Sequence, residues 1–148
     1  MVKRLLCSLL VSILFLNFSF ADENHEGGNF GEGKAILDVT ENGYKFKLSE
    51  RAIKTIKLKI QVISPLGENT FRVPKSSLIS FGEQFGVFVV RNGWFEIVEI
   101  KVKNRKNNAI NIISRKLSKS DQIVVSGVPL LRIAQLEASG EGGEGHGH

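Results

Sequence analysis

Two β-rich runs joined by a single tight-turn signal constrain the fold of this chain most strongly. Residues 85–90 and 94–103 are rich in Val, Ile and Phe, and Asn92-Gly93 lies between them. Asn-Gly favours a type I′ turn, because both central residues of that turn need positive φ. The sequence therefore predicts a long antiparallel hairpin in a chain dominated by β-structure.

The rest of the central region alternates apolar and polar residues with a period of two. Further strands are expected at residues 34–39, 44–48, 58–62, 71–73, 110–113 and 122–126. Turns are expected at Asn42-Gly43, at residues 64–69 and at Asn107-Asn108. Residues 75–79 are predicted to form one helical turn.

Two short helices complete the predicted elements. Ser49 is a suitable N-cap for a helix over residues 50–57, and Gly127 and Pro129 open a second helix over residues 130–136. With six to eight short strands, these helices predict a mainly β fold. We expect a small β-barrel-like domain built from both ends of the globular part.

The N-terminus has the three parts of a secretory signal peptide. Lys3 and Arg4 precede an apolar run over residues 5–16, and Ser19-Phe20-Ala21 offers small residues before a cleavage site. The apolar run is shorter than the roughly 18 to 20 residues that span a bilayer, which favours cleavage over an uncleaved anchor. We therefore expect export to the periplasm, with cleavage after Ala21.

Composition divides the chain into four segments. After the signal peptide (residues 1–21), residues 22–33 are expected to be a flexible leader and residues 138–148 a disordered Gly/Glu/His tail, since neither has the apolar side chains that offset ordering entropy. Residues 34–137 remain as one modest domain. Cys7 is the only cysteine and leaves with the signal peptide, so an apolar core must stabilise that domain.

The positive charge indicates the class of partner. The formal net charge is +5, and removing Lys3 and Arg4 leaves 18 basic and 15 acidic residues. In an exported protein a basic surface favours an acidic partner protein or anionic lipid, and no nucleic-acid partner is expected. The expected partner-binding residues form one cationic edge, which consists of Lys101, Lys103, Arg105 and Lys106. A second cationic edge, nearer the N-terminus, consists of Lys45, Lys47, Lys54, Lys57 and Lys59. The alternatives are an ordinary solvated face without a partner and lysines on an edge strand that prevent aggregation.

Catalysis is not expected, because residues 34–137 contain no histidine and no cysteine, and Ser126-Gly127 and Asp121 are interpreted as turn residues. The three histidines, His25, His146 and His148, lie in the two tails. Imidazole binds zinc, copper and nickel, so these histidines are candidate metal ligands. The alternative is a polar tail with incidental histidines, and the domain itself requires no cofactor.

Ordered motifs run from residue 71 to residue 136. They are Phe71-Arg72-Val73-Pro74-Lys75-Ser76-Ser77-Leu78-Ile79, Gly86-Val87-Phe88-Val89-Val90, Asn92-Gly93-Trp94-Phe95-Glu96-Ile97-Val98-Glu99-Ile100-Lys101-Val102 and Asp121-Gln122-Ile123-Val124-Val125-Ser126-Gly127-Val128-Pro129-Leu130-Leu131. This order resembles the C-terminal part of the periplasmic adaptor subunits, or membrane fusion proteins, of heavy-metal RND efflux pumps. Residues 44–59 resemble the segment with which these adaptors begin, with Lys57 where the family favours Gly.

The resemblance implies a fold and a partner. In a full adaptor a lipoyl-like domain, an α-helical hairpin and a β-barrel separate the two matching segments, whereas here only residues 64–72 do so. In the family the chain ends come together as the membrane-proximal domain, which is related to a circularly permuted SH3-like barrel and contacts the inner-membrane pump. The resemblance therefore implies that domain standing alone.

Three functional hypotheses remain. The leading one is a non-enzymatic periplasmic accessory, or truncated adaptor, of a heavy-metal or cation RND efflux system, which binds the inner-membrane pump or a full-length adaptor, supports transmembrane export and makes peripheral contact with the membrane. The second is a soluble periplasmic metal-binding or chaperone protein that uses its His-containing tails. The third is a stand-alone structural or interaction module.

Overall fold

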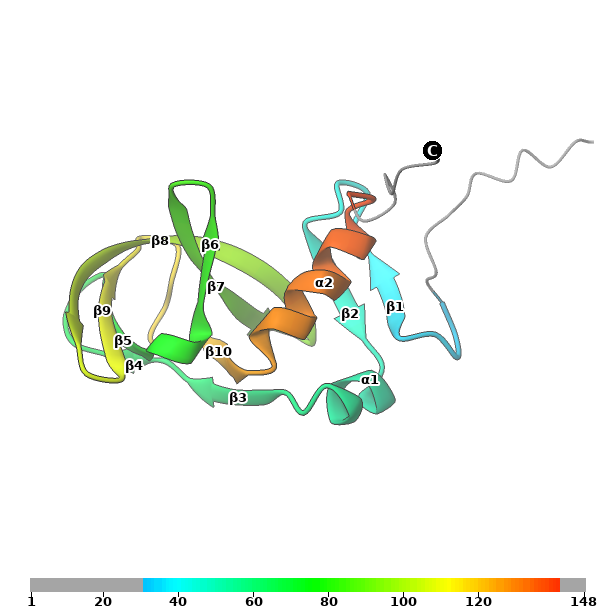
Figure 1. Cartoon of the computed structure of the whole chain (residues 1–148), viewed down its shortest axis with the longest axis horizontal. Helices are drawn as coiled ribbons and strands as arrows, with labels where there is room; N and C mark the ends of the chain where they lie inside the picture. Colours follow the sequence, from blue (N-terminus) through cyan, green and yellow to red (C-terminus); the bar gives the residue numbers. More distant parts are fainter. Residues whose placement is uncertain (1–30, 142–148) are drawn as a thin grey trace, which may run out of the picture.

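The computed structural model describes residues 31–141, which form a mainly β fold (Figure 1). The predicted signal peptide, most of the predicted leader and residues 142–148 lie outside the described residues. In chain order the elements are β1 (Ile36–Val39), β2 (Lys45–Leu48), α1 (Glu50–Thr55), β3 (Lys59–Val62), β4 (Ser64–Pro65), β5 (Thr70–Pro74), the 3-10 helix η1 (Lys75–Ser77), β6 (Leu78–Phe81), β7 (Gln84–Arg91), β8 (Trp94–Lys106), β9 (Ala109–Ile113), β10 (Gln122–Ser126) and α2 (Val128–Ala138).

The strands form a nearly closed, barrel-like sheet, as the alternating apolar pattern predicts. The strand order is β3-β10-β7-β8-β9-β5-β4. Only Ile63 separates β3 from β4, so the two ends of this order belong to one stretch of chain. Ile63 is buried, and its N–H donates to the carbonyl of Asp121 at 2.9 Å. The bend at Ile63 thereby carries the chain from one edge of the sheet to the other.

The long hairpin that the sequence predicts is formed by β7 and β8, which pair from Phe85↔Ile100 to Arg91↔Trp94. Asn92 and Gly93 have φ values of 53° and 79°, both positive as a type I′ turn requires. β8 continues beyond the hairpin, pairing with β2 near its start and with β9 along its second half. The hairpin therefore connects the barrel with the N-terminal strands.

Side chains of β7 alternate between two cores on its opposite faces. Val87 and Val89 belong to the core inside the barrel, and Phe88 belongs to a second core that includes residues of β1, β2 and α2. In the second core Phe46 stacks on Phe95, with ring centroids 5.7 Å apart, and meets Phe88 edge-on at 6.3 Å. Figure 1 shows α2 and the β1–β2 hairpin beside the barrel. Burial on both faces accounts for the unbroken apolar run in β7.

Both predicted helices are present, with shifted ends. Ser49 caps α1, since its Oγ accepts a hydrogen bond from the Ala52 N–H at 3.2 Å. α1 ends two residues earlier than predicted, before Lys57 takes a left-handed φ of 53°. α2 follows the left-handed Gly127 and has Pro129 in its first turn. Among residues 31–141, no helix combines the length and the hydropathy that a membrane span requires.

The predicted number of strands, six to eight, is too low, because the described residues contain ten. Only η1 is helical in the segment predicted to be a helical turn, and the chain then forms β6, which pairs with β7. β4 lies in a segment predicted to be a turn and pairs with β5. Both strands are short, with two and four residues, and each is completed by pairing with the strand that follows it in the chain, which their own brief apolar pattern does not predict.

Gly127→Ala is expected to destabilise the protein more than Gly93→Ala. Both glycines have φ of 79°, so both substitutions place Ala in a left-handed conformation that costs about 1 to 2 kcal/mol. A Cβ at Gly127 would lie 2.7 Å from Leu58 Cδ2 and 2.8 Å from the Ile56 carbonyl oxygen, whereas one at Gly93 would meet nothing within 4 Å. We expect a further loss of about 1 to 2 kcal/mol for Gly127→Ala. Urea unfolding measures both variants, and equal losses would contradict the close packing at Gly127.

Candidate docking surface

The first predicted set of cations, Lys101, Lys103, Arg105 and Lys106, lies in the second half of β8. The side chains of Lys101, Lys103 and Arg105 are exposed. Lys101 pairs with Ile113 of β9, next to the pairs whose side chains fill the barrel, so that it lies on the outer face of the sheet. This half of β8 is therefore a charged outer wall of the barrel.

A bulge at Lys103 divides this set. The register between β8 and β9 shifts between Val102 and Asn104. Arg105 consequently pairs with the buried Ile110, on the barrel side of the sheet. Its guanidinium carbon lies 5.8 Å from the centroid of the Phe85 ring, a cation–π contact. The bulge leaves Lys103 with Asn104 opposite Asn111, on the same side of the sheet as Lys101, and places Arg105 on the barrel side, where its side chain is still exposed.

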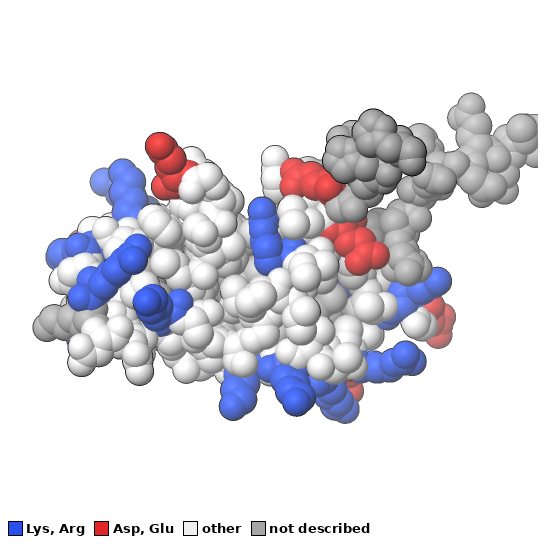
Figure 2. All heavy atoms as spheres, viewed as in Figure 1, with Lys and Arg blue, Asp and Glu red and all other residues white. Residues whose placement is uncertain are grey.

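Further cations surround Lys101 on neighbouring segments. Arg72 of β5 pairs with Asn111 of β9, and its Nε donates to Asn111 Oδ1 at 3.4 Å. Arg115 and Lys116 follow β9. Figure 2 shows Lys and Arg side chains gathered over the barrel end of the molecule. We call Arg72, Lys101, Lys103, Arg115 and Lys116 the barrel cationic face.

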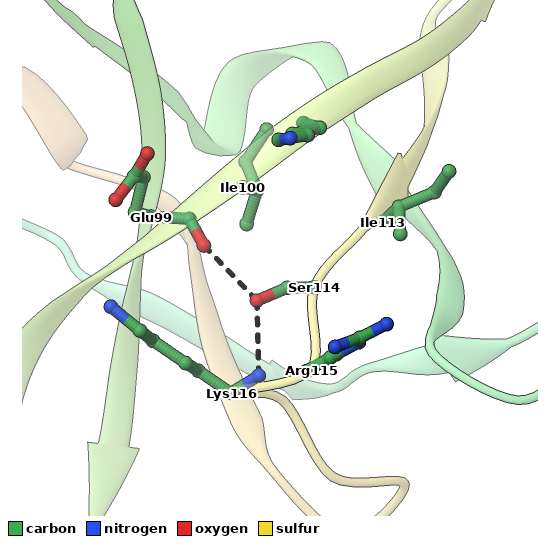
Figure 3. A pocket seen from close by; sticks show the side chains of 7 residues that line it. Glu99, Ile100, Ile113, Ser114, Arg115 and Lys116 are labelled. Atoms are coloured by element: carbon green, nitrogen blue, oxygen red, sulfur yellow. Dashed lines mark hydrogen bonds between the residues drawn. The ribbon is translucent and has the colours of Figure 1, made fainter.

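An open pocket of about 510 Å³ lies within this face, between β8 and the segment after β9 (Figure 3). Glu99 and Lys101 line it from β8, and Arg115 and Lys116 line it from the other side. Ser114 fixes this corner, because its Oγ donates to the Glu99 carbonyl at 3.0 Å and accepts from the Lys116 N–H at 3.2 Å. The pocket is therefore lined by three cations and one carboxylate.

The second predicted set of cations is mostly paired. Three of its lysines lie beside carboxylates: Lys45 contacts Glu96 at 2.9 Å, Lys47 contacts Asp38 at 4.0 Å, and Lys54 contacts Glu50 at 3.7 Å. Lys47 also lies 4.4 Å from the centroid of the Trp94 ring. Lys57 and Lys59 are exposed and form no ion pair with any residue in the described part of the chain.

A charged network that the sequence interpretation missed fixes the β7–β8 hairpin to the segment before β10. The Arg91 guanidinium donates to both carboxylate oxygens of Asp121, at 3.0 and 2.5 Å, and to Glu96 Oε1 at 2.6 Å. Lys45 completes the network through Glu96. Asp121 is 6% exposed and also accepts a hydrogen bond from the Ser118 N–H at 2.8 Å. Its interpretation as a turn residue therefore covers only part of its role.

The network lowers the pKa of Asp121. Burial is the largest single influence and raises this pKa, but the hydrogen bonds from Arg91 and Ser118 and the charge of Arg91 together outweigh it. The pKa of Arg91 is raised, first by its hydrogen bond to Asp121. Both groups are therefore charged at neutral pH and form a structural ion pair.

The candidate metal ligands His25, His146 and His148 lie outside the described residues. Between residues 31 and 141, no group of three or more His, Cys, Asp or Glu is placed to hold a metal ion. Comparison of the chain with family models, with curated proteins and with solved structures found no match. The charged surfaces described above are therefore the basis for a functional proposal.

Asp121→Asn is expected to destabilise the protein by about 1 to 3 kcal/mol at neutral pH, because the substitution removes the buried partner of Arg91. The pKa of Asp121 in the folded state lies below its ordinary value of 3.8. The ion pair therefore stabilises the fold fully above about pH 4, and this contribution is lost as the pH falls through the folded-state pKa. Denaturant unfolding between pH 7 and pH 2 should show the gap between wild type and variant narrowing in acid.

Asp38→Asn is the matched control for this measurement. The Asp38 side chain is half exposed and lies 4.0 Å from Lys47, so its loss is expected to change stability little at any pH. A gap between wild type and Asp121→Asn that stays constant with pH would contradict the proposed role of the ion pair.

Proposed function

We propose that this protein is a non-enzymatic periplasmic docking module of a heavy-metal or cation RND efflux system, which binds the inner-membrane pump or a full-length adaptor. The observation that carries the proposal is the meeting of the first and last described segments. Ile36 and Phe46 of the β1–β2 hairpin share one core with Leu131 and Ala138 of α2. The resemblance of the sequence to efflux adaptors implies a domain assembled in this way from both ends of the chain.

The backbone conformation of Lys57, a residue that departs from the adaptor pattern, also supports the proposal. Lys57 stands where that pattern favours Gly. Its φ of 53° is a left-handed conformation, which Gly adopts without steric cost and which costs other residues about 1 to 2 kcal/mol. The chain therefore keeps at Lys57 the conformation that a glycine would favour.

The barrel cationic face is the surface that we assign to the pump or adaptor. Its five cations are all exposed, on β5, on β8 and on the segment after β9, and Glu99 lies beside them in the pocket. Such a face attracts and orients an acidic protein surface, chiefly by raising the association rate. The barrel interior is filled by fully buried apolar side chains such as Val73, Val87 and Ile112. Because the interior is filled, we propose that the protein binds its partner through its outer surface.

Lys101→Glu with Lys103→Glu is expected to reduce capture of the efflux partner at least tenfold. Reversing two charges places carboxylates against the acidic surface of the partner. The test is chemical crosslinking in the envelope of the native organism, followed by purification and mass spectrometry. The wild-type protein should recover an inner-membrane RND pump or a full-length adaptor.

Lys57→Glu with Lys59→Glu makes the same change of charge at a distant site and should leave this capture intact. Failure of the wild-type protein to recover any envelope transporter would overturn the proposed function. Equal losses of partner capture in the two double variants would contradict the assignment of partner binding to the barrel cationic face.

A further inference from the structure

The side of the barrel opposite the barrel cationic face also has a distinctive surface. In the strand order, β10 and β7 separate β3 from β8 on one side, and β5 and β9 separate the continuous β3–β4 segment from β8 on the other. β3 therefore lies across the barrel from β8. Every residue of β3 is exposed, although the strand is paired with β10 along its length.

Ile60 and Val62 project outward from β3. Ile60 pairs with Val124, which belongs to the core beneath α2, and Val62 pairs with the exposed Gln122. Paired residues of antiparallel strands point to the same face, so Ile60 and Val62 lie on the side of the sheet that α2 covers. Their exposed fractions are 37% and 56%.

α2 adds two aliphatic side chains to this side. Leu131 and Gln135 are buried against the sheet, and the solvent-facing side of the helix therefore carries Leu130 and Ile133. Leu130 is 50% exposed and Ile133 is 61% exposed. Both side chains project from a convex surface, one helical turn apart.

Cations border this apolar surface. Ser126 pairs with Lys59, and Gly127 packs closely on Leu58, so Lys57 and Lys59 lie beside the start of α2. Figure 2 shows a row of Lys and Arg side chains along the edge formed by α1 and β3, with largely uncharged surface above it, where Figure 1 places α2. We call Lys57, Lys59, Ile60, Val62, Leu130 and Ile133 the α2–β3 surface.

We propose that the α2–β3 surface binds an anionic lipid bilayer. Aliphatic side chains beside lysines are the combination that peripheral membrane contact requires, because the apolar groups enter the headgroup boundary while the ammonium groups reach lipid phosphates. Lysine stems also pack along apolar surface and keep their charge at the interface. Side chains that project from a convex helix and an edge strand suit a deformable partner, whereas a rigid protein partner must supply a complementary cavity.

The first test is co-sedimentation of residues 22–148 with lipid vesicles. The apolar run at residues 5–16 is left out so that it cannot insert into the bilayer. The protein should bind vesicles that contain phosphatidylglycerol, bind pure phosphatidylcholine vesicles at least tenfold more weakly, and lose affinity as salt is raised. Absence of binding to the phosphatidylglycerol vesicles would overturn the proposal.

Two double variants and one control assign the binding to residues. Lys57→Gln with Lys59→Gln should weaken binding at least tenfold, since each lysine near an anionic surface contributes about 1 kcal/mol, or about fivefold. Leu130→Ser with Ile133→Ser should also weaken it at least tenfold. Lys101→Gln with Lys103→Gln removes the same charge from the barrel cationic face and should leave vesicle binding unchanged. Equal weakening by the two lysine double variants would overturn the proposal in favour of a general charge effect.

A spectroscopic measurement keeps the test independent of folding in the variants. An environment-sensitive fluorophore on Ile133→Cys should shift to the blue on phosphatidylglycerol vesicles, and the same label on Lys103→Cys should not. Binding of an acidic protein through the α2–β3 surface with no fluorophore shift on vesicles would overturn the proposal. The proposal is independent of the proposed function, because pump capture and vesicle binding are assigned to different residues and either can fail alone.

Discussion

Burial of β7 on both faces is the constraint on which the rest of the structure depends. Val87, Phe88 and Val89 are fully buried, and burying each side chain contributes about 1.5 to 3 kcal/mol only if both faces of the strand are covered. β5, β9 and β10 complete the barrel over one face, and α2 with the β1–β2 hairpin covers the other. Gly86 shows how close this packing is, because a Cβ there would lie 2.8 Å from Ile97 Cγ2. The same strand therefore brings the first and last described segments together.

The Arg91–Asp121 pair fixes the register of this arrangement. It lies where β7 meets β10, next to the Gln122↔Val90 pair. A slip of one residue would exchange the two faces of β10 and leave the carboxylate of Asp121 buried without its partner, which is costly. β10 has apolar side chains on both of its faces, so packing alone would tolerate a shifted register. The ion pair disfavours such registers.

The elements that could be predicted from the sequence are those with a local cause. The Asn92-Gly93 turn, the Ser49 cap and the alternation of apolar residues depend on neighbours in the chain, and they predict the hairpin, α1 and the mainly β fold correctly. β4 and β6 each pair with the next strand along the chain, β5 and β7, but Ser64-Pro65 is too short and Leu78–Phe81 does not alternate strictly enough to predict a strand. The contact of Arg91 with Glu96 could have been predicted as a diagonal pair across a hairpin of known register, whereas its contact with Asp121 could not, since 30 residues separate them.

The candidate surfaces could likewise be predicted from the sequence only in part. Alternation along β8 predicts that Lys101, Lys103 and Arg105 share one face, but the bulge between Val102 and Asn104 turns Arg105 to the other side. From the sequence alone, each apolar residue of the α2–β3 surface would be predicted to lie in the core, on a strand or on a helix. Only the pairing of β3 with β10 and the packing of Leu131 against the sheet show that Ile60 and Ile133 are left in solvent.

The sharing of β7 by two cores sets an order in which the domain opens. β2 is joined to β8 only at Lys45↔Glu96 and Phe46↔Phe95, and β1 is joined only to β2. Local unfolding of β1, β2 and α2 would leave the barrel with its own core and its own ring of backbone hydrogen bonds. Amide hydrogens in this layer would therefore exchange with water through fluctuations that leave β7 and β8 protected. Phe88 and Val124, which belong to the second core but lie on strands of the barrel, would be the residues at which such opening stops.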